Sequence, residues 1–190
     1  MRHIWTAALL LASMRAADVT VILNGDAAVP NSVSYPAKSE VTRIFAGIGV
    51  RLVWQLEGAK VSSPSASSFT IHAAFTTGTP WRSYPGALAY AEPFNSIHVI
   101  TVMYDRIQIT AFGRPRLVRT LLAHALAHEI GHLLLATDSH AETGIMKAHW
   151  TEGDYEEMQR KPMRFEPLDE EIIRKRMHLV ELPELSTRLK

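Results

Sequence analysis

The 190-residue sequence contains no cysteine, so it has neither disulfide bonds nor thiolate metal ligands. It also lacks a strong charge of either sign, and a formal net charge of +1 argues against a nucleic-acid-binding protein. No apolar stretch is long enough to span a bilayer, and there is no internal repeat or low-complexity block. The length and the 47% hydrophobic content instead indicate one globular domain with a sizeable core.

The N-terminus has the order of residues that is typical of a signal peptide. Arg2 and His3 form a short basic region, and an apolar core over residues 4–12 is followed by small residues. We therefore predict a signal peptide over residues 1–17 and a single mature domain over residues 18–190, secreted or periplasmic. The alternative is a short N-terminal segment of the core. An exported chain without disulfides must be stabilised by packing, and a bound metal would add to that.

Hydrophobic periodicity and turn residues predict four strands and three helices. The strands are expected over residues 19–23, 51–56, 69–75 and 96–105, and the helices over residues 37–48, 115–135 and 168–182. Pro115 stands where the first turn of a helix tolerates proline. The order is strand, helix, three strands and two helices, which indicates an α+β fold.

The long helix carries the most informative feature of the chain, the pentapeptide His128-Glu129-Ile130-Gly131-His132. A spacing of four residues places the two imidazoles about 40° apart on one face of a helix, with Glu129 to one side of them. The flanking residues are almost all Ala and Leu, so a carboxylate and two imidazoles here are costly unless they are paired or bind a metal. We predict a zinc site with His128 and His132 as ligands and Glu129 as the general base. The alternative is a buried helix with two satisfied histidines and a solvated glutamate.

This motif, followed by Gly144-Ile145-Met146, resembles the metzincin metallopeptidases, whose pattern is H-E-x-x-H-x-x-G-x-x-H/D with a later methionine turn. The resemblance implies a zincin-like fold, in which a small mixed sheet packs on a backing helix and an active-site helix, closed by a C-terminal helix. It also implies that Met146 forms an apolar floor beneath the metal. The activity it implies is that of a zinc-dependent endopeptidase.

The chain departs from the metzincin pattern at two positions, and both bear on the third zinc ligand. The glycine of the pattern falls on Leu135, and the third-ligand position falls on Asp138. Without that glycine the helix must end differently, and we expect the exit at Ala136, one residue later. His140 then comes within reach. Spacing favours Asp138, whereas chemistry favours His140 because imidazole is a good zinc ligand, and we predict His140 with Asp138 as the alternative.

Other residues near the motif have competing interpretations. In the gluzincin branch of zincins a later glutamate is the third ligand, and Glu152, Glu156 and Glu157 lie in a suitable window. We favour an exposed helix over residues 154–160 as their explanation. His124 precedes His128 by one helical turn, and it either lines the cleft, orients a ligand, or packs in the interior.

The metzincin resemblance also implies where a substrate would lie. Ala87, Leu88, Ala89 and Tyr90 take the place of the edge strand above the cleft, which can pair with an extended peptide through main-chain hydrogen bonds. By the same resemblance Trp150 belongs to the wall of a specificity pocket. We expect an exported zinc metallopeptidase acting on peptides or proteins. The alternative is a non-catalytic domain that is stapled by zinc and binds a peptide or protein.

Overall fold

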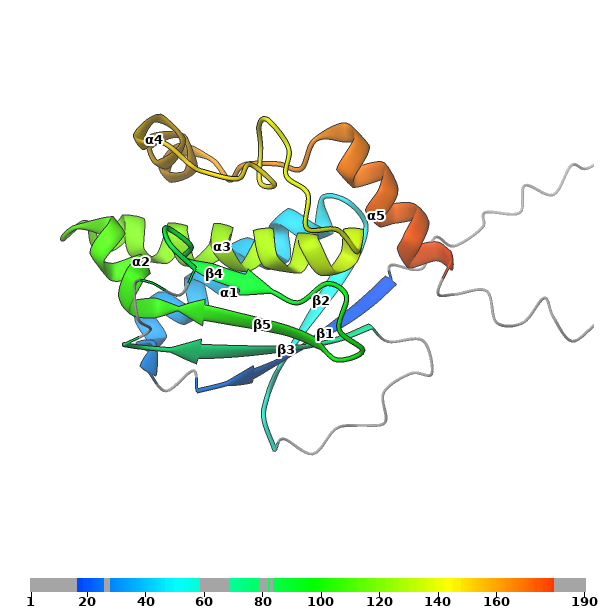
Figure 1. Ribbon diagram of the computed structural model, residues 1–190, viewed down its shortest axis with the longest axis horizontal. Coiled ribbons are helices and arrows are strands. Elements are labelled where there is room, and N and C mark those ends of the chain that lie inside the picture. Colours follow the sequence, from blue (N-terminus) through cyan, green and yellow to red (C-terminus); the bar gives the residue numbers. More distant parts are fainter. Residues whose placement is uncertain (1–16, 26–27, 59–68, 79–81, 83, 180–190) are drawn as a thin grey trace, which may run out of the picture.

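The computed structural model describes residues 17–25, 28–58, 69–78, 82 and 84–179 (Figure 1). The predicted signal peptide, apart from Ala17, lies outside these residues. Within them there are five strands and five helices. The strands are β1 (Ala17–Asn24), β2 (Val50–Leu56), β3 (Phe69–Thr76), β4 (Ala89–Ala91) and β5 (His98–Met103). The helices are α1 (Asn31–Ala46), α2 (Tyr104–Ala111), α3 (Pro115–Leu135), α4 (Glu152–Arg160) and α5 (Pro167–Leu179).

The described strands form one sheet in the order β2-β1-β3-β5-β4. β1, β2, β3 and β5 run parallel, and β4 pairs antiparallel with β5 at the edge, so the predicted mixed sheet is confirmed. Side chains along β1 alternate between a buried and a partly exposed face. Val19, Val21 and Leu23 are buried, whereas Thr20 and Ile22 are partly exposed. The hydrophobic core therefore lies on one face of the sheet.

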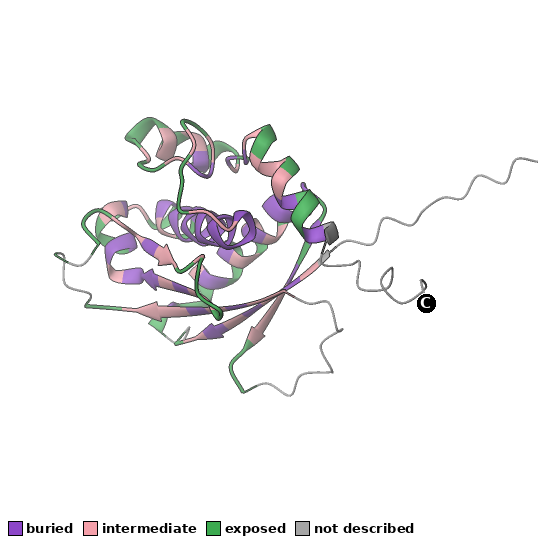
Figure 2. Cartoon of the chain, turned by 45° about the vertical axis from the view of Figure 1, so that its right-hand side comes forward, coloured by how far each residue is buried: buried purple, intermediate pink, exposed green. Residues whose placement is uncertain are grey.

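α3 lies at the centre of the molecule, between the sheet and the C-terminal segment that contains α4 and α5 (Figure 1). Every residue from Thr120 to Leu135 is buried, as the colouring of α3 in Figure 2 makes visible. The predicted bounds of this helix, 115–135, are confirmed. Among the described helices, none combines the length and apolarity needed to cross a bilayer.

The exit from α3 is at Ala136, as expected from the missing glycine. Ala136 has left-handed dihedral angles, φ 50° and ψ 51°. Its N–H donates to the carbonyl of Leu133 at 3.3 Å, and the N–H of Thr137 donates to the carbonyl of His132 at 3.2 Å. These two bonds form the Schellman motif, which usually has glycine at the left-handed position. The chain turns sharply here and returns over α3.

Three parts of the sequence prediction need correction. α2 was not expected, and the strand predicted to reach residue 105 ends at Met103. The reason is that α2 buries Arg106, a charge that interrupts its apolar periodicity. α1 begins at Asn31, six residues before the expected start, because Pro36 is accommodated inside the helix. α4 begins two residues earlier than expected, where Thr151 and Asp154 form a capping box.

Candidate metal centre

Three histidines meet at the surface of α3. One ring nitrogen from each of His128, His132 and His140 lies within 4.8 Å of the others. His128 and His132 project from α3, and His140 comes from the segment that returns over it. No other group of three His, Asp or Glu among the described residues has this geometry. Asp138 lies outside the cluster, although it lines the same cavity.

The hydrogen bonds of two of these rings fix the positions of their protons. Nδ1 of His128 lies 2.8 Å from the carbonyl of Ile145, and Nδ1 of His132 lies 2.8 Å from the carbonyl of Thr137. A carbonyl oxygen only accepts, so each Nδ1 carries the proton and each Nε2 keeps a lone pair. The two Nε2 atoms are 3.0 Å apart. Two facing lone pairs repel each other unless a cation lies between them.

The donor set fits a zinc ion. Zinc–nitrogen bonds of 2.0–2.1 Å in tetrahedral geometry place two nitrogens about 3.3 Å apart, close to the observed separation. Burial lowers the pKa of His128 to about 4, against the raising effect of its bond to Ile145. Burial also lowers the pKa of His132, while the Thr137 carbonyl and the charge of Asp138 oppose that shift. Both rings are therefore neutral near pH 7, which is the form that binds metal.

Glu129 is buried next to the first of these histidines and lines the same cavity. Burial raises the pKa of its carboxyl group to about 8, and a hydrogen bond from the backbone amide of Ala91 acts in the opposite direction. Ala91 belongs to β4, so this bond links α3 to the edge of the sheet. A carboxyl group with a raised pKa is suited to proton transfer near neutral pH.

A tight turn over residues 144–146 supports the first histidine. Gly144 has φ 72°, and a Cβ atom there would lie 2.5 Å from the carbonyl oxygen of Arg164. The next residue, Ile145, donates its N–H to that carbonyl at 2.9 Å and offers its own carbonyl to His128. The turn therefore connects the 161–166 segment to the ring of His128 through two consecutive hydrogen bonds.

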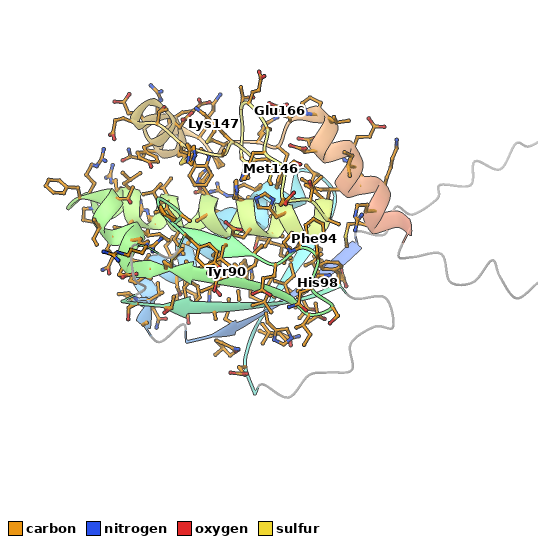
Figure 3. All side chains as sticks on the ribbon, in the orientation of Figure 1. Tyr90, Phe94, His98, Met146, Lys147 and Glu166 are labelled. Atoms are coloured by element: carbon orange, nitrogen blue, oxygen red, sulfur yellow. The ribbon has the colours of Figure 1, made fainter. Side chains whose placement is uncertain are left out.

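Met146 packs directly against α3 (Figure 3). Its side chain is buried, and its Sδ atom would lie 2.5 Å from a Cβ atom added at Gly131. Phe165 would lie 2.9 Å from the same Cβ atom. The glycine within the pentapeptide therefore leaves the space that Met146 occupies.

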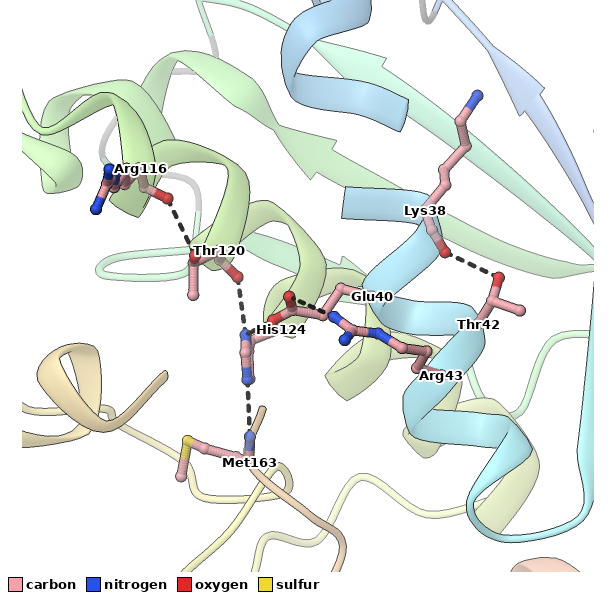
Figure 4. Close-up of polar contacts among 8 residues, drawn as sticks. All are labelled: Lys38, Glu40, Thr42, Arg43, Arg116, Thr120, His124 and Met163. Carbon is pink, nitrogen blue, oxygen red and sulfur yellow. Dashed lines mark hydrogen bonds and ion pairs between the residues drawn. The ribbon is translucent and has the colours of Figure 1, made fainter. Parts of the chain in front are cut away.

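His124 is not part of the cluster, and it joins α3 to the segment before α5 (Figure 4). Its Nδ1 bonds to the carbonyl of Thr120 at 2.8 Å, so its Nε2 accepts the N–H of Met163 at 3.0 Å. Burial lowers the pKa of His124 to about 4, and the Thr120 carbonyl opposes this shift. Glu40 of α1 approaches Nδ1 at 3.8 Å. His124 is therefore neutral and buried, and its hydrogen bonds join α3 to the segment before α5.

The histidines and Glu129 open into a cavity of about 380 Å³. Residues 85–91 form one wall, including all four of the predicted edge residues, and residues 147–150 form the opposite wall. The Trp150 ring lies edge-on to His128 with 5.6 Å between ring centroids. Thr110 of α2 and Tyr155 of α4 also line the cavity. Sequence reasoning missed both, because neither carries a motif and α2 was not predicted.

β4 presents an open edge to this cavity. The N–H of Met103 donates to the carbonyl of Leu88 at 2.9 Å, and the N–H of Glu92 donates to the carbonyl of Val99 at 3.1 Å. Antiparallel ladders alternate, so the groups of Ala89 and Ala91 point away from β5. These outward groups are the ones an added strand would use.

The glutamates considered under the gluzincin alternative are not brought to the histidines. Glu152 is exposed and forms an ion pair with Arg114. Glu157 pairs with Lys161 at 3.4 Å, and Glu156 is exposed. None of the three belongs to the histidine cluster.

The five-stranded mixed sheet, backed by helices and by the central helix α3, has a zincin-like fold, which confirms the predicted fold. The sequence matches no protein-family profile and no curated protein. Among solved structures, the chain is similar to the crystal structure of archaemetzincin (amzA) from Methanopyrus kandleri, with a TM-score of 0.51. The alignment covers 90% of this chain and 99% of that one at 12% sequence identity. At this identity the likeness establishes the fold alone.

Proposed function

We propose that this protein is a zinc-dependent metallopeptidase of the metzincin type, with His128, His132 and His140 as ligands. The observation that carries the proposal is the pair of Nε2 lone pairs 3.0 Å apart, next to a buried carboxyl group in an open cavity. Both features are costly in a core of Ala and Leu unless a cation is bound. The fold shared with archaemetzincin supports the same class of protein.

In this proposal each residue has a defined role. Bound zinc would supply a Lewis acid that polarises the scissile carbonyl and acidifies water. Glu129 accepts the proton of the attacking water and passes it to the leaving amine. The outward groups of Ala89, together with the outward carbonyl of Ala91, hold the substrate main chain in an extended conformation. Met146 forms the methionine turn, an apolar floor beneath the ligands.

The test combines metal content with hydrolysis. Purified protein is expected to bind one zinc ion and to cleave casein. Glu129→Gln should keep the zinc and lose hydrolysis, whereas His132→Ala should lose both. Hydrolysis retained in Glu129→Gln would remove Glu129 from its role as base, and unchanged zinc content in His132→Ala would refute the site.

The third ligand is tested by a matched pair of variants. Loss of zinc in His140→Ala but not in Asp138→Ala would support the three-histidine site. The reverse result would restore the metzincin spacing with Asp138 as ligand. Zinc bound by the wild type without hydrolysis of any peptide would favour the non-catalytic, zinc-stapled alternative.

We also propose that the chain is exported as a single domain over residues 18–190. The order of basic, apolar and small residues within 1–17 supports this. N-terminal sequencing of the protein from its native source would test it, and an intact Met1 would refute it.

A further inference from the structure

Arg106 is fully buried in α2, although arginine is among the residues least often found inside a protein. Its Nη1 donates to the carbonyl of Tyr84 at 2.6 Å and to the carbonyl of Ala87 at 3.0 Å. A buried guanidinium group is costly unless such bonds are made, so they define where these carbonyls lie. Arg106 itself does not line the cavity.

The segment that Arg106 holds is the wall of the cavity immediately before β4. Residues 85–88 line the cavity, and the carbonyl of Leu88 then makes the first ladder bond to β5. Tyr84 has the unfavourable φ of 53°, and its ring stacks on Tyr90 with 4.2 Å between centroids. A non-glycine residue keeps such a φ only where its surroundings impose it. The bond from Arg106 and the stack on Tyr90 supply that constraint.

The hydrogen bond from Arg106 to Ala87 also reduces the number of outward main-chain groups with which a peptide could pair. By the alternation along β4, Ala87, Ala89 and Ala91 share the outward side. The carbonyl of Ala87 is engaged by Arg106, and the amide of Ala91 is engaged by Glu129. Ala89 is thus the central outward residue, with engaged groups on both sides of it.

We propose that Arg106 is a positioning residue for substrate, which holds residues 84–88 so that an extended peptide pairs with β4 in one register, centred on Ala89. The proposal rests on the proposed peptidase function, and Arg106 takes no part in the chemistry. Removing it should therefore weaken peptide binding while leaving the histidines and Glu129 in place.

The test compares Arg106→Met and Arg106→Lys with Ile107→Ala, a control that removes a buried side chain from the same helix. We expect KM for a peptide to rise about tenfold in Arg106→Met, the equivalent of one or two lost hydrogen bonds, with kcat and zinc content unchanged. Arg106→Lys should restore part of the affinity, because both bonds come from one nitrogen that an ammonium group can replace. Ile107→Ala should lower thermal stability without this rise in KM.

A second readout does not depend on hydrolysis. Amide exchange at Met103, whose N–H donates to Leu88, should accelerate at least tenfold in Arg106→Met relative to the amides of β1, on the scale of one or two lost hydrogen bonds. An equal rise in KM in Ile107→Ala, or unchanged KM and Met103 exchange in Arg106→Met, would overturn the proposal. If Arg106→Met does not fold, Arg106→Lys must show the same effects at smaller size. If the wild type cleaves no peptide, the proposed function and the substrate register fail together, while Met103 exchange still decides whether Arg106 holds the segment.

Discussion

Replacing Ala136 with glycine is expected to stabilise the protein. Ala136 has φ 50° and ψ 51°, and this left-handed conformation costs an L-residue about 1–2 kcal/mol. Glycine avoids the cost but loses more backbone freedom on folding, by about 0.5–1 kcal/mol relative to alanine. At the midpoints of these two ranges the balance predicts a gain of about 0.75 kcal/mol in the free energy of unfolding. For a chain of this size, that raises Tm by about 1–4 °C.

The assay is denaturant unfolding of the metal-free protein, with the midpoint and the slope compared between variants. Ala123→Gly is the matched control, because Ala123 is buried in the middle of the same helix and should cost about 1 kcal/mol or more. Zinc affinity should not change in Ala136→Gly. The groups that orient His132 at this turn are main-chain carbonyls and amides, which glycine retains.

A loss of stability in Ala136→Gly would refute this reasoning. It would mean that the alanine methyl group contributes packing worth more than the backbone strain, or that α3 does not end in the left-handed conformation. A gain that appears equally in Ala123→Gly would show that the effect does not come from the left-handed position, because glycine makes the unfolded chain more flexible and should by itself lower stability.

Three further outcomes are expected. Gly144→Ala should lower the free energy of unfolding by about 2 kcal/mol or more and weaken zinc binding, because it places an alanine in a left-handed conformation against the carbonyl of Arg164. Denaturant unfolding and metal competition measure the two effects. Zinc at a hundred times its Kd should raise the free energy of unfolding of the wild type by about 2.7 kcal/mol, but not that of His132→Ala, in chelator-controlled denaturation. The pKa of His124 is lowered to about 4 in the fold, so the unfolded chain binds a proton at His124 more readily than the folded chain does. The free energy of unfolding is therefore unaffected by this group above about pH 6.5 and decreases as the pH falls towards 4. When the free energy of unfolding is measured at several pH values between about 4 and 6.5, its slope against pH should be smaller in His124→Gln than in the wild type by up to about 1.4 kcal/mol per pH unit. An unchanged slope would contradict this assignment.

The parts of the molecule that local sequence determines were predicted well. The bounds of α3 follow from Pro115 and a long run of Ala and Leu, and the relation between His128 and His132 is set within one helix. The exit at Ala136 followed from the absence of glycine at Leu135. These features depend on backbone geometry over a few residues, which a single sequence specifies.

The features that depend on contacts between distant segments were not derivable in the same way. Arginine side chains are solvated in most proteins, so the burial of Arg106 in α2 could not be inferred from its residue type. Thr110 and Tyr155 reach the cavity only because α2 and α4 both pack near the N-terminal end of α3 (Figure 1). The choice between Asp138 and His140 also depended on the path of the chain after α3, where the structure brings the histidine into the cluster.

The alternation along β4 has a consequence for the composition of any peptide that adds to this edge. In an antiparallel ladder the peptide residue opposite Ala89 gives its own N–H to the outward carbonyl of Ala89. Proline has no N–H, so a proline at that one position loses the bond, whereas the residues on either side point away and tolerate it. Main-chain pairing at this edge would therefore discriminate by substitution on the peptide nitrogen rather than by the peptide's side chains.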